Sequence, residues 1–150
     1  MITGIGHIAF RVTNLQRALD FYCNTLGFSE AFHLEQEGRP SPWIVYIQIA
    51  PGSFIELFPD SQDAPGTIPA RDPQASYKHV CLLVDDMSAT LSELAARGLE
   101  IAKAPTQGLD HNLQFWIDDP DGNPIELMQI MPNSPQAAAD ARLQIRSKLR

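Results

Sequence analysis

The sequence predicts an α+β protein made of two tandem βαβββ units and a C-terminal helix, and two repeated patterns support this fold class. The tripeptide Ile-Glu-Leu occurs at residues 55–57 and again at 125–127, each time at a similar distance after a strand that opens with histidine. The apolar pattern of residues 6–12 is also matched by residues 78–84, at an offset of 72. Because short tripeptides recur by chance, it is the longer match that indicates a duplicated unit.

Composition and charge favour a single domain, residues 1–150, that acts on small molecules. A chain of 150 residues suits one compact domain, or two half-domains that share a core. The formal net charge of -7 argues against nucleic acid and anionic membranes as partners. No apolar run approaches the roughly 20 residues that a membrane-spanning helix needs, and no secretory leader is evident. We therefore expect a cytoplasmic protein whose two cysteines are thiols rather than a disulfide.

The first unit is expected at about residues 4–60. From His7 to Val12, side chains alternate so that His7 and Arg11 share one face and the apolar residues share the other. Asn14 is a good N-cap for an amphipathic helix, which Gly27 ends. Turn residues then separate three further strands, which we expect at 28–34, 43–49 and 54–58.

The second unit, at about residues 77–131, repeats this order after a proline-rich linker at 61–76. A strand is expected from His79 to Val84, and a helix follows it and stops at Gly98. The remaining strands are expected at 99–103, 113–117 and 124–130. The tail, 132–150, is predicted to be helical from Pro135, with its basic residues at the C-terminal end, where the helix dipole favours them.

Four polar residues stand at matching positions in the two units and suggest a metal site. His7 lies 49 positions before Glu56, and His79 lies 47 positions before Glu126. For any one of these residues alone, the simpler interpretation is a core histidine or a glutamate on an exposed strand face. Both glutamates, however, interrupt apolar strands, where a buried carboxylate needs compensation. Two imidazoles and two carboxylates brought to one point would bind a divalent cation.

Several motifs extend this similarity to a known family. They are Gly6-His7-Ile8, the helix at 15–22 with Leu26-Gly27-Phe28, Lys78-His79-Val80, and the segment 118–127. Over about residues 4–131 the chain resembles the vicinal oxygen chelate superfamily (glyoxalase, bleomycin resistance protein and dioxygenase), and especially glyoxalase I (lactoylglutathione lyase). The resemblance implies a curved, cup-shaped mixed sheet around one ion of nickel, zinc, cobalt or manganese. It also implies His7, Glu56, His79 and Glu126 as the ligands.

The activity that this resemblance implies is that of a lyase or isomerase. A proton would move through a metal-bound enediolate on a 2-oxoaldehyde–thiol hemithioacetal, or on a related α-hydroxycarbonyl compound. Glu126 is the preferred base and Glu56 the second candidate.

Three residues are candidates for contact with substrate. Arg11 matches the position that in glyoxalase I helps to hold a carboxylate of glutathione. Asp60 stands where that enzyme usually has a neutral amide, and its charge would repel such a carboxylate. His111 lies in a polar loop, 106–112, that replaces the family's glycine-rich, lysine-bearing loop. A glutathione adduct and a sugar-like or cyclitol-like substrate both stay open.

Other members of the superfamily supply the alternatives. An epimerase of a polar metabolite is the runner-up, although methylmalonyl-CoA epimerases typically have glutamine where this chain has Glu56. Extradiol dioxygenases use two histidines and one glutamate, so a fourth ligand disfavours them. Drug-binding resistance proteins commonly lack the metal residues, and a metal-dependent thiol transferase would usually carry a potassium-binding loop that is not found. A homodimer is expected, because modules of this superfamily pair within one chain or across two.

Overall fold

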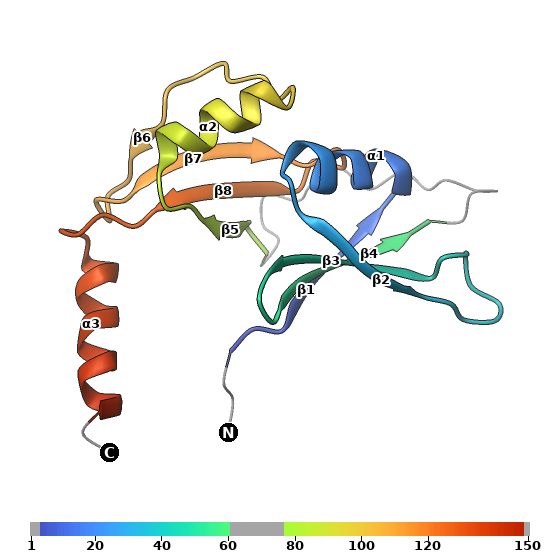
Figure 1. Ribbon diagram of the computed structural model, residues 1–150, viewed down its shortest axis with the longest axis horizontal. Coiled ribbons are helices and arrows are strands. Elements are labelled where there is room, and N and C mark those ends of the chain that lie inside the picture. The colour runs from blue at the N-terminus through green and yellow to red at the C-terminus, as the bar shows by residue number, and fades with distance from the viewer. Residues whose placement is uncertain (1–3, 61–76, 149–150) are drawn as a thin grey trace. The chain divides into compact units, whose positions relative to one another are not determined.

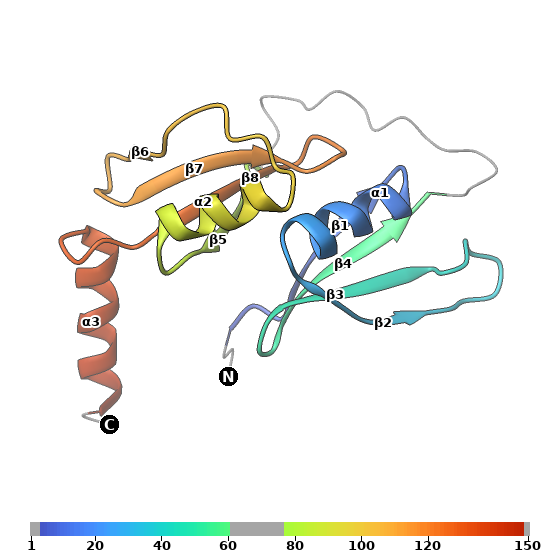
Figure 2. The same ribbon diagram turned by 45° about the horizontal axis from the view of Figure 1, so that its top comes forward.

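The computed structural model describes residues 4–60 and 77–148, which form two compact units (Figures 1 and 2). Of the described residues, the first unit holds 4–60 and the tetrapeptide Asp119–Gly122, and the second unit holds the rest. The expected linker, 61–76, lies outside the described residues.

The first unit is a four-stranded mixed sheet with one helical segment, as predicted. Its strands run in the order β1-β4-β3-β2, with β1 parallel to β4 and the other neighbours antiparallel. The elements are β1 (His7–Val12), α1 (Leu15–Leu19), a π-helical turn η1 (Asp20–Thr25), β2 (Ser29–Leu34), β3 (Ile44–Ala50) and β4 (Ser53–Pro59).

The second unit repeats this connectivity, with strands in the order β5-β8-β7-β6. Again the first and last strands are parallel neighbours. Its elements are β5 (Val80–Leu83), α2 (Met87–Ala96), β6 (Thr106–Gln107), β7 (Leu113–Asp118), β8 (Pro124–Gln129) and a final helix α3 (Pro135–Lys148). The predicted fold class, two βαβββ modules and a C-terminal helix, is confirmed. No described helix has the length and apolar character needed to cross a membrane.

The helix boundaries follow the capping signals of the sequence. The side chain of Asn14 accepts a hydrogen bond from the backbone N–H of Arg17 at 2.9 Å. Asp86 does the same for Ala89 at the start of α2. Gly27 and Gly98 follow the helical segments with φ of 80° and 95°, the left-handed conformation that glycine adopts at little cost.

The strand predicted at 99–103 is wrong. The edge strand β6 lies farther along the chain and has only two residues, Thr106 and Gln107, which pair with Gln114 and Leu113. The segment 99–104 and most of β7 line a cavity, and the segment is not paired with β7 in the ladder. Pro105, which has no N–H to donate, comes directly before the short strand.

In each unit a helix covers one face of the sheet (Figures 1 and 2), and the buried apolar side chains of the core lie on that face. In the first unit, Ile55 and Leu57 are fully buried on this face, and Tyr22 of η1 stacks on Phe10. The hydroxyl of Tyr22 also donates a hydrogen bond to the buried carboxylate of Asp119, at 2.8 Å. The helix is therefore held to its sheet by apolar packing and the tetrapeptide by a buried hydrogen bond.

We expect Leu57→Ala to lower the free energy of unfolding by about 2–5 kcal/mol, because it leaves a cavity in a closely packed core. Leu109→Ala is the matched control, since Leu57 is 0% and Leu109 104% exposed. The control should change stability by about 0.5 kcal/mol or less. Urea unfolding followed by circular dichroism measures both, and equal losses would contradict this account of the core.

Candidate metal centre

Each unit places one glutamate on the central strand next to its first strand. Glu56 in β4 lies between Ala9 of β1 and Tyr46 of β3. The apolar neighbours of Glu56 point to the helix-covered core, so the alternation of the strand turns the glutamate to the opposite face. Glu56 and Glu126 are each only 6% exposed. Because burying a carboxylate without partners is costly, each glutamate needs neighbouring groups that stabilise its charge.

In the first unit, Glu56 has an imidazole and a phenol as neighbours. The Nδ1 atom of His7 lies 3.5 Å from Oε1 of Glu56. The hydroxyl of Tyr46 forms a hydrogen bond with Glu56, and this bond is the main reason why the pKa of Tyr46 is raised. The ring of Tyr46 also meets the ring of His7 edge-on, with centroids 6.5 Å apart.

In the second unit, Glu126 has an imidazole and a thiol as neighbours. Nε2 of His79 lies 3.1 Å from Oε2 of Glu126. Cys81 is opposite Glu126 on β5, and Trp116 is opposite it on β7. The pKa of Cys81 is raised to about 12, chiefly because the thiol is withdrawn from water and further by the charge of Glu126 and a hydrogen bond to it. The ring of Trp116 lies edge-on to that of His79, at 4.8 Å.

The two pairs have the donor types that a divalent cation takes. The side chain of His7 is 52% exposed and that of His79 is 35% exposed, each beside a buried carboxylate. Each pair thus offers an accessible nitrogen and an anionic oxygen, which fits nickel, zinc, cobalt or manganese. Within 4–60 and 77–148, no three His, Cys, Asp or Glu side chains are arranged so that they could hold a metal ion. That all four residues share one ion stays a prediction.

Arg11 and Asp60, both predicted to contact substrate, are paired with each other. The Nη2 atom of Arg11 donates to Oδ2 of Asp60 at 2.9 Å, and Nε donates to the other oxygen. This hydrogen bonding and the charge of Asp60 raise the pKa of Arg11 above its ordinary value. Because both oxygens of the largely buried Asp60 carboxylate bond to the exposed guanidinium, Asp60 already compensates the cation.

His111 lies at an exposed position in a tight turn. Its φ is 65°, and its backbone N–H donates to the carbonyl of Gly108. The next residue, Asn112, is fully buried and bonds to Asp110, to Gln136 and to the backbone of Met131. The polar loop is thus organised by Asn112, which sequence reasoning missed. In the described part of the chain, His111 belongs to no group of side chains that could hold a metal ion.

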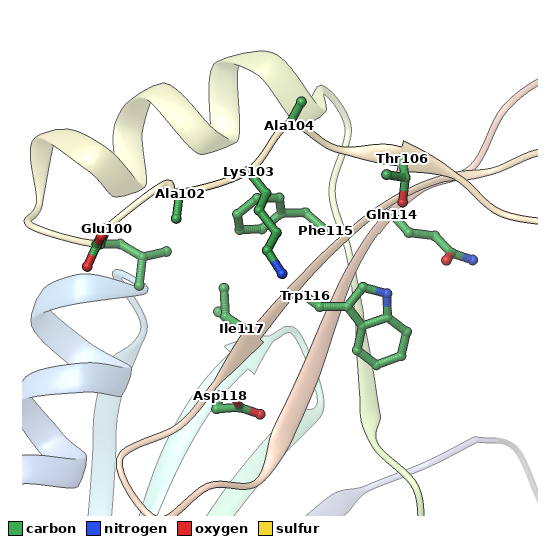
Figure 3. Close-up of a pocket in the computed structure, with 11 residues that line it drawn as sticks. Glu100, Ala102, Lys103, Ala104, Thr106, Gln114, Phe115, Trp116, Ile117 and Asp118 are labelled. Carbon is green, nitrogen blue, oxygen red and sulfur yellow. The ribbon is translucent and has the colours of Figure 1, made fainter.

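Sequence reasoning also missed a cavity of about 400 Å³ in the second unit (Figure 3). It lies along the edge of β7, where the short β6 leaves that strand uncovered. Figure 3 shows the side chain of Lys103 in this space, with Phe115 and Trp116 on different sides of β7. Trp116 borders the cavity, and its ring also contacts that of His79 in the second histidine–glutamate pair.

Comparison with known proteins identifies the family. The sequence profile of the Glyoxalase/Bleomycin resistance protein/Dioxygenase superfamily matches residues 4–127. The chain belongs to this superfamily. Members of the superfamily are mostly enzymes that act on small molecules, and they commonly bind a divalent metal ion. The family expected from the sequence motifs is thus confirmed.

Individual relatives in the superfamily are distant. The chain is 28% identical to the uncharacterized protein YaeR of Escherichia coli K12, over 83% of this chain and 95% of that protein. It is also 28% identical to a probable lactoylglutathione lyase of Synechocystis sp. PCC 6803, over 82% of this chain and 92% of that protein. The solved structure of SMU.1112c, 22% identical, has a TM-score of 0.70 and covers 85% of this chain and 99% of its own.

Relatives with other activities are about equally similar. A catechol-2,3-dioxygenase of Bacillus subtilis is 26% identical over 88% of this chain, which spans only 43% of that protein. A human mitochondrial methylmalonyl-CoA epimerase is 28% identical over 60% of this chain and 51% of that protein. Similarity to superfamily members therefore gives the class of protein and leaves the reaction to be argued from the residues.

We expect Asp60→Asn to strengthen the binding of glutathione, by about fivefold at most, because the variant leaves the charge of Arg11 uncompensated. Isothermal titration calorimetry with glutathione as the probe measures the change. Glu93→Gln is the matched control, since Glu93 also pairs with an arginine, Arg97, and the net charge changes equally. If both variants gain affinity alike, the effect comes from net charge rather than from Arg11.

The raised pKa of Cys81 predicts a thiol that stays protonated at neutral pH. In metal-free Cys23→Ser protein, the rate of alkylation by iodoacetamide should keep rising with pH through 10, because the thiolate is the reactive form. The rate should become constant only near the pKa of about 12. A plateau reached by pH 9 would mean that the thiol is not withdrawn from water and placed beside Glu126 as described.

Proposed function

We propose that the chain is a metal-dependent lyase or isomerase of the glyoxalase I type. His7, Glu56, His79 and Glu126 would hold one divalent ion of nickel, zinc, cobalt or manganese. One observation carries this proposal: each copy of a duplicated unit puts a histidine within 3.5 Å of a buried glutamate at the equivalent place on its sheet. Packing alone does not explain two buried carboxylates, because an apolar residue would fill each position at a lower free-energy cost.

The charges of the donor set suit the reaction. Two carboxylates and two neutral imidazoles nearly balance a dication. When bound, such an ion polarises the substrate carbonyl and stabilises negative charge that develops beside it.

Glu126 is the proposed base. Its carboxylate would take a proton from the carbon next to the substrate carbonyl and return it to the adjacent carbon, which isomerises the substrate without redox change. Glu56 is the second candidate for this role. A 2-oxoaldehyde–thiol hemithioacetal, or a related α-hydroxycarbonyl compound, has the acidic carbon that this step needs. The similarity to a probable lactoylglutathione lyase supports this substrate class.

A second candidate function follows from the pairing of Arg11 with Asp60. A substrate carboxylate would meet a cation that is already compensated, so the pair argues against a glutathione adduct. An uncharged polar substrate, sugar-like or cyclitol-like, would not need this cation. The same base would then remove and return a proton at one carbon, which is epimerisation. For the other candidate functions, a thiol transferase or a drug-binding resistance protein, the described residues give no comparable support.

We also propose a homodimer, with the four ligands supplied by one chain or by two. A mixing experiment separates these arrangements. One variant carries Glu56→Gln and the other carries Glu126→Gln, and the two are refolded together. Activity that returns only in the mixture requires a site made by two chains, whereas sites made within one chain stay impaired in every dimer.

We expect Glu126→Gln to lower turnover by about 10²- to 10⁴-fold while the protein keeps its metal, because the amide cannot accept the proton. The measurement is turnover and solvent-deuterium exchange on metal-reconstituted protein, with metal content from elemental analysis. Methylglyoxal plus glutathione is compared with hydroxyketones and keto-sugars. Glu93→Gln, on the exposed side of α2, is the control. Unchanged turnover in Glu126→Gln would reject the assigned base, and metal content unaffected by removing all four ligands would reject the site.

A further inference from the structure

The two histidine–glutamate pairs differ in the side chain that stands opposite each glutamate. Glu56 has Tyr46 across from it on β3, whereas Glu126 has Trp116 at the equivalent position on β7. A tyrosine hydroxyl can donate a hydrogen bond to a carboxylate through a single, well-defined atom. The duplicated unit therefore carries a phenol beside one glutamate only.

The ring of Tyr46 contacts three other aromatic rings. It stacks on Phe32 with centroids 4.2 Å apart and an angle of 19° between the planes. It also meets Phe54 and His7 edge-on, at 6.2 Å and 6.5 Å. These contacts restrict the two torsion angles of the side chain, so the hydroxyl that bonds to Glu56 has little freedom to move.

The hydrogen-bond donor on the strand next to Glu126 is weaker than the one next to Glu56. Beside Glu126, the thiol of Cys81 forms a hydrogen bond with the carboxylate, and a thiol is a weak donor. Donors behind a ligating carboxylate set its orientation, and the loss of such a donor typically costs about 10- to 100-fold in metal affinity. The two carboxylates are thus held unequally.

We propose that Tyr46 is a positioning residue that holds Glu56 as the fixed metal ligand and leaves Glu126 as the glutamate free to move a proton. This inference rests on the proposed metal site. It assigns metal binding to one carboxylate and proton transfer to the other. It assigns a role to a residue that neither repeat motif contains. It also gives a structural reason for choosing Glu126 over Glu56 as the base.

Tyr46→Phe tests the proposal, because it removes the hydroxyl and keeps the ring that packs on Phe32. Titration of the metal-free full chain with Co²⁺, followed by visible absorption, reports both affinity and ligand geometry. We expect affinity to fall by about 10- to 100-fold and the cobalt spectrum to change. At saturating Co²⁺, turnover should fall much less in Tyr46→Phe than in Glu126→Gln, since the base is retained.

Tyr22→Phe is the matched control in the same unit. It also removes a tyrosine hydroxyl that bonds to a buried carboxylate, that of Asp119. It should lower the melting temperature and leave Co²⁺ affinity and the spectrum unchanged. Phe32→Leu is a second test that keeps the hydroxyl but removes the stacking ring, and it should weaken Co²⁺ binding less than Tyr46→Phe does.

The outcomes separate this inference from the proposed function. If Glu56→Gln weakens Co²⁺ binding and Tyr46→Phe does not, the role of Tyr46 is overturned and the metal site stands. If Tyr46→Phe abolishes turnover at saturating Co²⁺ as fully as Glu126→Gln does, the division between a fixed ligand and a base is overturned. If neither Glu56→Gln nor Glu126→Gln alters Co²⁺ binding, the proposed function itself fails.

Discussion

The compensation of a carboxylate buried within a sheet is the constraint on which each unit depends. Glu56 and Glu126 are flanked along their strands by apolar side chains that fill the core. Those neighbours determine which way the strand faces, so the glutamate must point to the other side, where it is still almost fully buried. An unpartnered charge there would cost several kcal/mol, roughly the scale of a domain's whole stability. The imidazole, phenol and thiol around the two carboxylates meet that need and also leave nitrogen and oxygen donors for a cation.

The order of the strands supplies these partners. Because the first and last strands of each unit are parallel neighbours, a histidine at the first residue of the first strand, or directly before it, reaches a glutamate in the last strand. The strand on the other side then brings one aromatic side chain to each glutamate. A single connectivity, used twice, therefore builds two similar surroundings, and the differences between Tyr46 and Trp116, and between Ala9 and Cys81, decide how the carboxylates differ.

Much of the fold could be predicted from local signals, and the parts that could not depend on contacts between distant residues. Asn14, Asp86 and the two helix-ending glycines act within a few residues of their own position, which makes them readable in the sequence. The error at 99–103 has a different origin, since whether an edge segment pairs depends on what lies between it and its neighbour. For the same reason, Tyr46 and Cys81 become partners of the glutamates only once strand order and register are known. The convergence of the four predicted ligands on one ion stays a prediction.

The ion pair of Arg11 with Asp60 also affects how solutes approach the protein. With that guanidinium compensated, Arg11 does little to offset the formal charge of -7 for an incoming anion. Electrostatic steering acts over roughly 8 Å at physiological ionic strength and fades as salt is added. An anionic metabolite would therefore be captured more slowly in dilute buffer than in salt, whereas a neutral one would arrive at the same rate in both.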